Sequence, residues 1–373
     1  MQNKISLFKV HMPESIKAPL WETLFSGFIG QGPKVNEFEE CLKSFVESPY
    51  PVTLNSATSG LQLALRLANV GPGDEVISTA MTCTATNMPI LASGARIVWA
   101  DVDPISGNIT PEAIEERITP QTKAILVVHW GGQPCKMNEI NQIAKKHSLK
   151  VIEDAAHAFG SEYMGRKIGN HSDYVVFSFQ AIKHITTVDG GVLFCKSEED
   201  YNRAKLLRWY GIDREEKGRT DFRCENNIPE WGYKFHMNDV AATIGIEQLK
   251  FAGEIVRKHR DNAAFYYDSL QGIPGVRLVE KSTDWKSAYW LFTMHTQRRD
   301  EFTQFMSDNG VMTSKVHNRN DIHTAFAEAK TYPMPGLEKF YESMVCIPVG
   351  WWITESERSY IVEKIRAFSK NHI

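Results

Sequence analysis

The sequence predicts an α/β protein in which helices cover a mostly parallel central sheet, followed by a smaller α+β unit. Between Val35 and Phe194, short β-branched runs alternate with segments of helical period. These runs are apolar almost throughout, which is typical of strands that are covered on both faces. The length of 373 residues exceeds what one core usually holds. We therefore expect a large domain over residues 1–250 and a smaller one over residues 251–373.

Six strands are expected in the large domain, each short and apolar: Asp74–Thr79, Ala95–Ala100, Lys123–His129, Leu149–Asp154, Tyr174–Phe179 and Gly191–Cys195. Helices are expected between them, several opened by an N-cap residue or a proline: Val35–Val46, Ser59–Ala68, Pro111–Ile118 and Met137–His147. The polar stretch Asp213–Trp231 predicts a long loop of the kind that is usually functional. Beyond it we expect a helix over Asn238–Ala252 that continues to about Leu270, a strand over Tyr289–His295, and helices over Arg299–Asn309 and Glu355–Phe368.

The composition argues against several classes of partner. With 42 basic and 45 acidic residues the net charge is −3, which gives no broad positive field for nucleic acid or an anionic membrane. No stretch has the length of a signal peptide core or a membrane span. The cysteines form no C-x-x-C pair, so we expect reduced, mostly buried thiols, no metal site and a cytoplasmic location. They are Cys41, Cys83, Cys135, Cys195, Cys224 and Cys346.

Small hydroxyl and glycine residues between Leu54 and Gly60 stand directly before a predicted helix. Free N–H groups at a helix N-terminus, together with hydroxyl donors, form a phosphate site. Ser56, Ala57 and Thr58 are therefore candidates for binding a phosphate group. An ordinary helix cap explains Ser56 or Thr58 equally well, and this segment alone favours the cap.

Asp154 is an acid at the end of an apolar strand, at the edge where open α/β sheets bind their ligands. A carboxylate there can hold a pyridine nitrogen protonated and so let a cofactor ring accept electrons. His157 follows closely and could pack flat on such a ring. Asp154 could instead cap the following turn, and His157 could be a structural histidine.

Lys183 lies in apolar surroundings just beyond another buried strand, in the string FSFQAIKHITTVDGG over Phe177–Gly191. Desolvation lowers the pKa of a lysine and raises its nucleophilicity, as Schiff-base chemistry requires. Ser178 adds a hydroxyl that could bind phosphate. Most lysines are solvated surface charges, so Lys183 is a convincing candidate only in combination with the other features.

Polar and aromatic residues close the long loop at Gly232–Asn238 and open the next helix. This segment could reach into the site of a neighbouring subunit. It could equally be a helix start with a buried tyrosine and phenylalanine.

Taken together, these features resemble the DegT/StrS sugar aminotransferases, a branch of the fold type I pyridoxal-phosphate (PLP) enzymes. The resemblance covers nearly the whole chain, and the pattern F-S-F-x-x-x-K-x-x-T-T-x-x-G-G is its most specific part. The other matching strings are Ser26–Pro33, Gly71–Ile77, Thr119–Ile125 and Val151–Gly160. The resemblance implies the fold type I PLP-transferase fold and pyridoxal 5'-phosphate as the cofactor.

The same resemblance implies residue roles. Lys183 would bind the cofactor covalently and later move a proton between cofactor and substrate, Asp154 would pair with the pyridine nitrogen, and His157 would lie against the ring. Together these three are the predicted catalytic residues. The predicted cofactor-binding residues are Ser56, Ala57, Thr58, Cys83, Asp154, His157, Ser178, Lys183 and His236.

Family members complete their sites across a dimer interface, so the resemblance implies a homodimer in which the loop ending near His236 belongs to the partner's site. Two positions depart from the family pattern. Cys83 stands where an aromatic residue usually covers the cofactor, and His236 stands where asparagine is more frequent. The predicted substrate-binding residues are Lys234, His317, Arg319 and His323; an arginine there could meet a diphosphate, or the group could lie on a surface loop.

The string that follows Lys183 looks like that of members acting at the fourth carbon of the sugar. We therefore expect transfer of an amino group from glutamate to a nucleotide-linked 4-keto-6-deoxy sugar, in amino sugar and polysaccharide biosynthesis. Such a reaction would run in two half-reactions, with the cofactor carrying the nitrogen between glutamate and the sugar.

Two alternatives remain open. A dehydratase of the same family carries histidine in place of the lysine, and His184 is adjacent, although the F-S-F-x-x-x-K spacing puts Lys183 at the lysine position. A catalytically silent PLP-binding regulatory protein is the second alternative, and Cys83 and His236 are the features that favour it.

Overall fold

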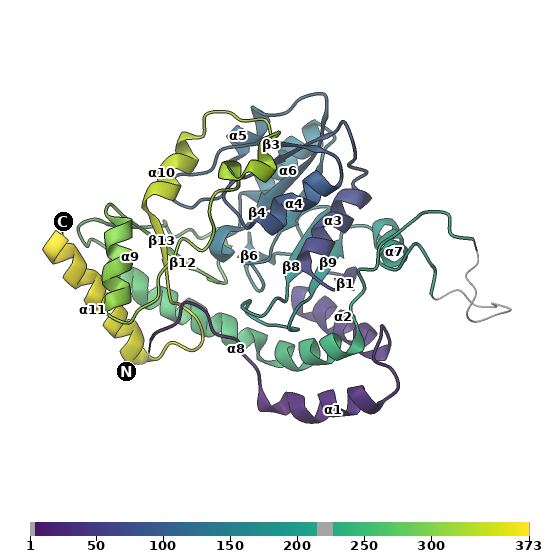
Figure 1. Ribbon diagram of the computed structural model, residues 1–373, viewed down its shortest axis with the longest axis horizontal. Helices are drawn as coiled ribbons and strands as arrows, with labels where there is room; N and C mark the ends of the chain where they lie inside the picture. The colour runs from purple at the N-terminus through teal and green to yellow at the C-terminus, as the bar shows by residue number, and fades with distance from the viewer. Residues whose placement is uncertain (1–3, 215–226, 373) are drawn as a thin grey trace.

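The computed structural model describes residues 4–214 and 227–372, and its centre is a seven-stranded sheet (Figure 1). Its strand order is β1-β9-β8-β5-β4-β2-β3. Of these strands β9 alone runs opposite to the others. The strands are β1 (Pro51–Leu54), β2 (Glu75–Ser78), β3 (Arg96–Trp99), β4 (Thr122–Val128), β5 (Lys150–Asp154), β8 (Tyr174–Ser178) and β9 (Gly191–Cys195). A mostly parallel sheet is the predicted fold class, which is confirmed.

The sequence predicted all but one strand of this sheet. The strand it missed, β1, has only four residues and pairs antiparallel with β9 at the sheet edge. So short a run carries no periodicity that would separate it from a loop. β1 nevertheless matters for the site because it leads directly to the residues at 55–58.

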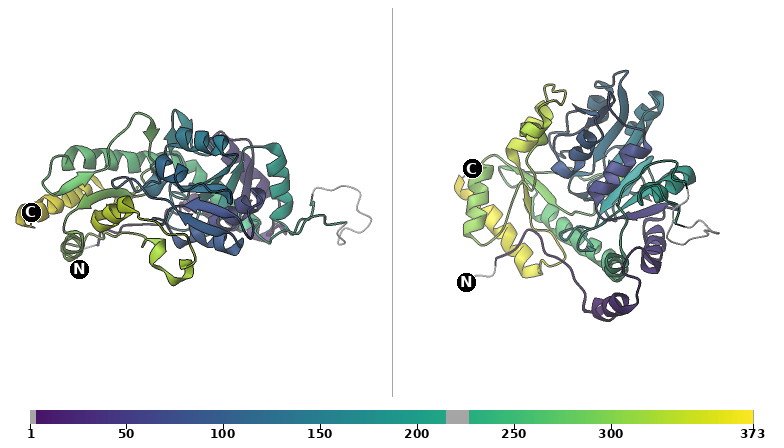
Figure 2. Two further views of the ribbon diagram at one scale, coloured as in Figure 1. Left: turned by 90° about the horizontal axis from the view of Figure 1, so that it is seen from above. Right: turned by 45° about the vertical axis from the view of Figure 1, so that its right-hand side comes forward.

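Helices cover both faces of the sheet (Figures 1 and 2). One face packs against α3 (Ala57–Leu67), α4 (Thr84–Ala92) and α7 (Glu198–Leu207). The other face packs against α2 (Pro33–Val46), α5 (Pro111–Glu115), α6 (Met137–Lys146) and the first half of α8 (Asp239–Leu270). Because both faces are covered, the strands are apolar at nearly every position.

Two helix starts show how the sequence fixes the layers. Asn238 caps α8, since its side chain accepts the N–H of Ala241 at 2.8 Å. The next residue, Asp239, is fully buried and accepts N–H groups at the start of α2, from Gly32 at 2.8 Å and Val35 at 3.1 Å. A carboxylate stabilises the positive end of a helix, so Asp239 holds α2 and α8 together.

The C-terminal part has a core of its own, built on a three-stranded sheet of order β10-β12-β13. Its elements are β10 (Val276–Leu278), β12 (Phe292–Thr296), β13 (Met344–Ile347), α9 (Arg299–Asp308) and α11 (Glu355–His372). The helix α8 is a single element of 32 residues that passes through position 250 and joins both cores. The division at residue 250 stays a prediction. Strand β12 begins later than predicted because Tyr289 is left-handed, with φ +48°.

The remaining elements connect these layers: η1 (Glu14–Ile16), α1 (Lys17–Phe25), η2 (Trp130–Gly132), β6 (Glu162–Tyr163), β7 (Arg166–Lys167), β11 (Trp285–Lys286), η3 (Asn320–Ile322), η4 (Thr324–Phe326) and α10 (Pro335–Ser343). Most of the loop predicted at Asp213–Trp231 lies outside the described residues. Within the described part, no helix combines the length and the apolar character that a membrane crossing needs.

Candidate active site

The site forms at the carboxyl edge of the central sheet, where β5 and β8 end side by side. Asp154 is the last residue of β5 and Ser178 is the last residue of β8. The two strands pair in parallel, with Asp154 beside Val176. Lys183 lies in the turn that follows β8, where its N–H donates to the carbonyl of Gln180 at 2.9 Å. Parallel pairing therefore brings the predicted acid and the predicted lysine to the same edge.

The Lys183 amine is withdrawn from solvent and lies against an aromatic ring. Its Nζ lies 3.6 Å from the centre of the Trp290 ring, close enough for a cation–π contact. Burial lowers the pKa of Lys183 to about 8, while the charge of Asp154 opposes that shift. A neutral amine is the nucleophilic form, so this surrounding makes Lys183 reactive near neutral pH.

Asp154 is buried, and both carboxylate oxygens accept hydrogen bonds. Thr86 donates its hydroxyl to Oδ2 at 2.6 Å, and the N–H of Ala156 donates to Oδ1 at 3.1 Å. Burial raises the pKa of Asp154, whereas these two bonds and the charge of Lys183 act in the opposite direction. The contact with Ala156 is the turn cap that the sequence left open as an alternative. It uses Oδ1 alone, so Oδ2 is not part of the cap.

His157 belongs to an aromatic cluster above this edge. Its ring stacks on Trp290, with centroids 3.9 Å apart and 20° between the planes. His317 lies nearly parallel to it, at 5.9 Å and 5°. Burial lowers the pKa of both imidazoles, that of His317 to about 4, so both rings are neutral at pH 7. No described residue hydrogen-bonds the Nδ1 atom of His157 or the Nε2 atom of His317.

The start of α3 has both features that the sequence left open, a side-chain cap and free N–H groups that could bind phosphate. Ser56 caps the helix by accepting the N–H of Ser59 at 3.1 Å. Ala57 and Thr58 form the first turn, whose N–H groups have no carbonyl partner within the helix. A Cβ atom at Gly191 would lie 2.6 Å from the nitrogen of Ala57. Gly191 therefore lets β9 pack directly against the helix start, and Ser56 itself is used as a cap.

The segment that carries Lys234 and His236 lies beside the end of β1. His236 forms a bridge with Leu54, and the N–H of Asn55 donates to the carbonyl of Phe235 at 2.7 Å. The His236 ring contacts Trp209 at a centroid distance of 3.7 Å, and burial lowers its pKa to about 4. Lys234 is exposed. Within one chain, this segment thus lies next to the start of α3.

The three candidates on the C-terminal segment are placed differently from one another. His317 joins the aromatic cluster and is near enough for the Lys183 charge to lower its pKa further. Arg319 instead makes a double hydrogen bond to Asp321, at 2.7 and 2.6 Å. His323 is half-buried between two short 3-10 helices. Only His317 therefore reaches the cluster around Lys183, while Arg319 has a carboxylate partner of its own.

His184 points away from the site. Its Nε2 atom hydrogen-bonds the carbonyl of Ala288 at 3.0 Å, and its ring packs 4.8 Å from that of His259 on α8. Burial lowers the pKa of His184 well below its usual range. Cys83, by contrast, lies at the N-cap of α4, close enough to Lys183 to influence the pKa of that amine. The adjacent histidine is a core residue, and Lys183 alone of the pair faces Asp154.

Sequence reasoning missed two residues of this site, Trp290 and Thr86. Trp290 contacts both Lys183 and His157, stacks on Phe8 with centroids 5.0 Å apart, and donates its Nε1–H to the carbonyl of Ile182 at 2.9 Å. No local pattern identifies it. Thr86 stands in a hydroxyl-rich stretch, T-C-T-A-T at 82–86, and that richness was the available signal.

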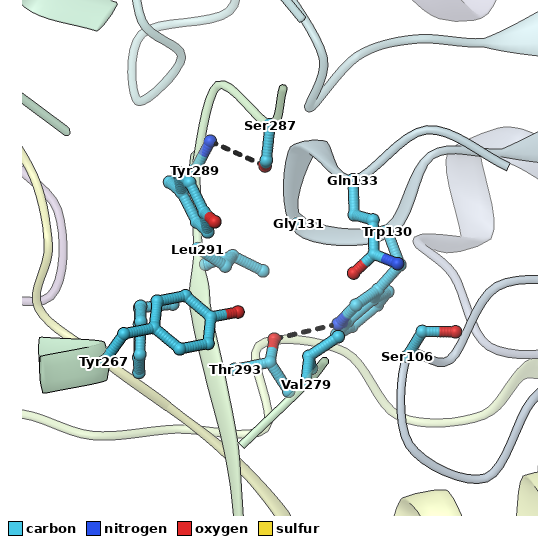
Figure 3. A pocket seen from close by; sticks show the side chains of 11 residues that line it. Ser106, Trp130, Gly131, Gln133, Tyr267, Val279, Ser287, Tyr289, Leu291 and Thr293 are labelled. Atoms are coloured by element: carbon cyan, nitrogen blue, oxygen red, sulfur yellow. Dashed lines mark hydrogen bonds between the residues drawn. The ribbon is translucent and has the colours of Figure 1, made fainter. Parts of the chain in front are cut away.

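A small cavity lies beside the aromatic cluster, lined by Trp130, Tyr267, Tyr289 and Thr293 among others (Figure 3). Trp130 donates its Nε1–H to Thr293 at 3.1 Å and meets His157 and His317 edge to face. The cavity measures about 20 Å³, room for about one water molecule. It is too small to bind a sugar nucleotide.

These groups fit a pyridoxal phosphate molecule. Lys183 is an amine of lowered pKa, Asp154 is a buried acid at the strand end, His157 is a neutral flat ring, and the start of α3 offers free N–H groups. An aldehyde, a pyridine nitrogen and a phosphate each have a partner of suitable chemistry among them. The fold and the site together define the class of PLP-dependent fold type I aminotransferases.

The chain belongs to the DegT/DnrJ/EryC1/StrS aminotransferase family, whose model matches residues 11–366. The sugar aminotransferase CalS13 from Micromonospora echinospora has 39% identity and a TM-score of 0.93, covering 97% of this chain and 99% of its own. Spr1654 from Streptococcus pneumoniae, solved in a PLP form, has 27% identity and a TM-score of 0.91, with coverage of 99% and 100%. The Bacillus subtilis spore coat polysaccharide biosynthesis protein SpsC is 32% identical over 361 residues, which are 94% of this chain and 93% of SpsC. The predicted family and cofactor are thereby confirmed.

Proposed function

We propose that this protein transfers the amino group of glutamate to a nucleotide-linked 4-keto-6-deoxy sugar and so makes a 4-amino sugar. The observation that carries the proposal is the electrostatic coupling of Lys183 with Asp154: a partly buried amine with a pKa of about 8 lies near enough to a buried carboxylate for each charge to shift the pKa of the other. This pairing supports both covalent capture of the cofactor and proton transfer next to it.

When bound, pyridoxal phosphate supplies an electron-accepting ring and an aldehyde carbon that can carry the amino group. Asp154 would hold the proton on the ring nitrogen. Lys183 would take a proton from one carbon atom and return it to another once its amine is free. His157, neutral and stacked on Trp290, would cover one face of the ring and exclude water from it.

The string after Lys183 supports the choice of the fourth carbon. Thr186 donates its hydroxyl to the carbonyl of Phe179 at 3.1 Å, and Thr187 donates to the carbonyl of Asp189 at 2.8 Å. Gly190 is needed because a Cβ atom there would lie 2.1 Å from the Thr187 hydroxyl. The motif therefore fixes the shape of the loop that carries Lys183.

We also propose a homodimer with shared sites. The exposure of large apolar side chains on and after α1 supports this proposal: Trp21, Phe25 and Phe28 are 65%, 71% and 63% exposed. The chain that follows is tied to the start of α8, since Asp239 donates its N–H to Gly30 at 2.7 Å. This apolar surface thus borders the segment that ends at His236. A second copy bound there would bring the exposed ammonium group of Lys234 and the neutral ring of His236 to its partner's phosphate site.

The experiment is a pair of half-reactions in the purified protein, loaded with PLP. Glutamate alone should convert the cofactor and release one equivalent of 2-oxoglutarate per site. A panel of keto-sugar nucleotides, with the keto group at the third or the fourth carbon, should then restore the original absorption only with 4-keto sugars. Restoration by 3-keto sugars alone would contradict the choice of carbon, and no release of 2-oxoglutarate would favour the silent regulatory protein.

The dehydratase alternative finds little support in the site. That chemistry needs a histidine where the lysine stands, but the ring of His184 is bound to Ala288 in the core. Borohydride treatment separates the two cases. The treatment should attach the cofactor permanently to Lys183, and a peptide map should then show the adduct. A loaded protein with no such adduct would favour the dehydratase.

A further inference from the structure

Two buried threonine hydroxyls form a chain of hydrogen bonds that ends on Asp154. Thr86 donates to Oδ2 of Asp154 at 2.6 Å, and the hydroxyls of Thr82 and Thr86 lie 2.7 Å apart. Both threonines are 1% exposed. An O–H donor at such a distance from a carboxylate oxygen is typical of a charge-assisted hydrogen bond.

The direction of this chain follows from the number of protons. A threonine hydroxyl has one proton to donate. Because Thr86 gives its proton to Asp154, Thr82 must be the donor in the bond between the two hydroxyls. Both protons thus point toward the carboxylate, and this order stabilises the ionised form of Asp154 over the protonated form.

The outer end of the chain is fixed by Asn320, which is fully buried. Its Nδ2 atom donates to the carbonyl of Thr82 at 2.7 Å, and its Oδ1 atom accepts from Asn87 at 2.9 Å. Its backbone N–H donates to the carbonyl of Ala80 at 2.7 Å. Asn320 lies between Arg319 and Asp321, so the segment with the substrate-binding candidates is anchored on the loop that carries Thr82, directly before the first turn of α4, which carries Thr86.

We infer that Thr86 is a positioning residue that keeps Asp154 ionised and aimed at the cofactor ring, with Thr82 and Asn320 holding Thr86 in place. The inference rests on the proposed role of Asp154. It adds a reason why an acid whose burial favours the protonated form remains a carboxylate. It also gives the segment at 317–323 a physical connection to the acid, through Asn320 and Thr82.

The test replaces the Thr86 hydroxyl by a methyl group in Thr86→Val. This change leaves Oδ2 of Asp154 without its donor at nearly constant volume. We expect kcat to fall about 10- to 100-fold, the effect of losing a hydrogen bond to a charged group. The pH midpoint of the bound cofactor's visible band should rise. When the ring nitrogen holds its proton less firmly, the ring carries less positive charge, and it then repels the proton on the lysine–cofactor linkage less.

Three further variants separate positioning from stability. Thr86→Ser keeps the donor and should restore kcat and the pH midpoint. Thr82→Val should shift both in the same direction by less. The matched control is Thr243→Val, which removes a buried hydroxyl on α8 that makes two hydrogen bonds at 2.8 Å away from the site. It should change thermal stability and leave the pH midpoint unchanged.

Asp154→Asn, measured in parallel, distinguishes this inference from the function it rests on. If Asp154→Asn loses activity while Thr86→Val keeps both its kcat and its pH midpoint, the positioning role is rejected and the function stands. If Asp154→Asn keeps full activity, the proposed role of the acid is itself wrong. An equal spectral shift in Thr243→Val would also overturn the positioning role, and should Thr86→Val fail to fold, Thr82→Val and Thr86→Ser still decide the question.

Discussion

Two regions of the molecule supply the candidate active site, and they differ in how their residues are held. At the carboxyl edge, Asp154 and Ser178 end neighbouring strands, and Lys183 follows within one turn. The other region consists of the segments at 232–238 and 317–323, which reach the site from distant parts of the chain. There, His236 packs on Trp209 and His317 joins Trp130, whereas Arg319 pairs with Asp321.

The comparison teaches that a strand end fixes a side chain in a way that a long loop does not. Parallel pairing sets the height and direction of every residue at the sheet edge. A loop residue is placed only by the contacts that it happens to make. We therefore expect substitutions at the edge to change chemistry by orders of magnitude, and substitutions on the loops to change binding and assembly.

The largest expected effect contrasts two adjacent residues. Lys183→Ala should reduce transamination by several orders of magnitude with no loss of fold, because it removes the amine that we propose as the covalent partner of the cofactor. His184→Ala should do the reverse, lowering the free energy of unfolding by about 2–4 kcal/mol through a lost buried ring and hydrogen bond. Turnover and thermal melts of the two variants check this. Retained turnover in Lys183→Ala would reject the assignment.

The next effect contrasts the two acids at the end of β5, which point to opposite faces. Asp154→Asn should lower kcat by orders of magnitude, since a neutral amide no longer stabilises the protonated ring nitrogen. Glu153→Gln should leave kcat nearly unchanged: Glu153 accepts from Nε2 of His129 at 2.8 Å, and a glutamine oxygen can accept the same bond. Steady-state rates on both variants provide the measurement, and equal losses would contradict the assignment of roles.

The same contrast explains what the sequence could and could not predict. The positions of Asp154, Lys183 and the start of α3 at the sheet edge were predictable because each follows or precedes a regular element with a clear pattern. Trp290 was not, because its place depends on a left-handed residue before it, Tyr289, and on the packing of the C-terminal core against the sheet. The two hydrogen bonds from Arg319 to Asp321 could not be predicted either, since two residues of separation on a loop imply no contact.

A smaller effect concerns the assembly of the site from two copies. If His236 serves its partner's phosphate site, Lys183→Ala and His236→Ala damage different sites, and a mixed dimer keeps one site intact. Random mixing of the two inactive variants should then recover about a quarter of the activity of the unmodified protein, given a symmetric dimer. Activity after mixing, unfolding and refolding together measures this, with each variant refolded alone as the control. No recovery would mean that each chain builds its own site.

The smallest expected effect is the pH dependence of the free amine, and it tests the surroundings of Lys183 without any turnover. Below its pKa the amine is an unreactive ammonium, so its rate of modification rises by about tenfold per pH unit and levels off above the pKa. With burial lowering the pKa of Lys183 to about 8, the rise in cofactor-free protein should end near that pH. Reductive methylation followed by peptide mass spectrometry measures the rate, with the exposed Lys123 in the same sample as the comparison. If the Lys183 rate still climbs steeply at pH 10, burial is not controlling the amine. The contrast between the sheet edge and the loops would then rest on geometry alone.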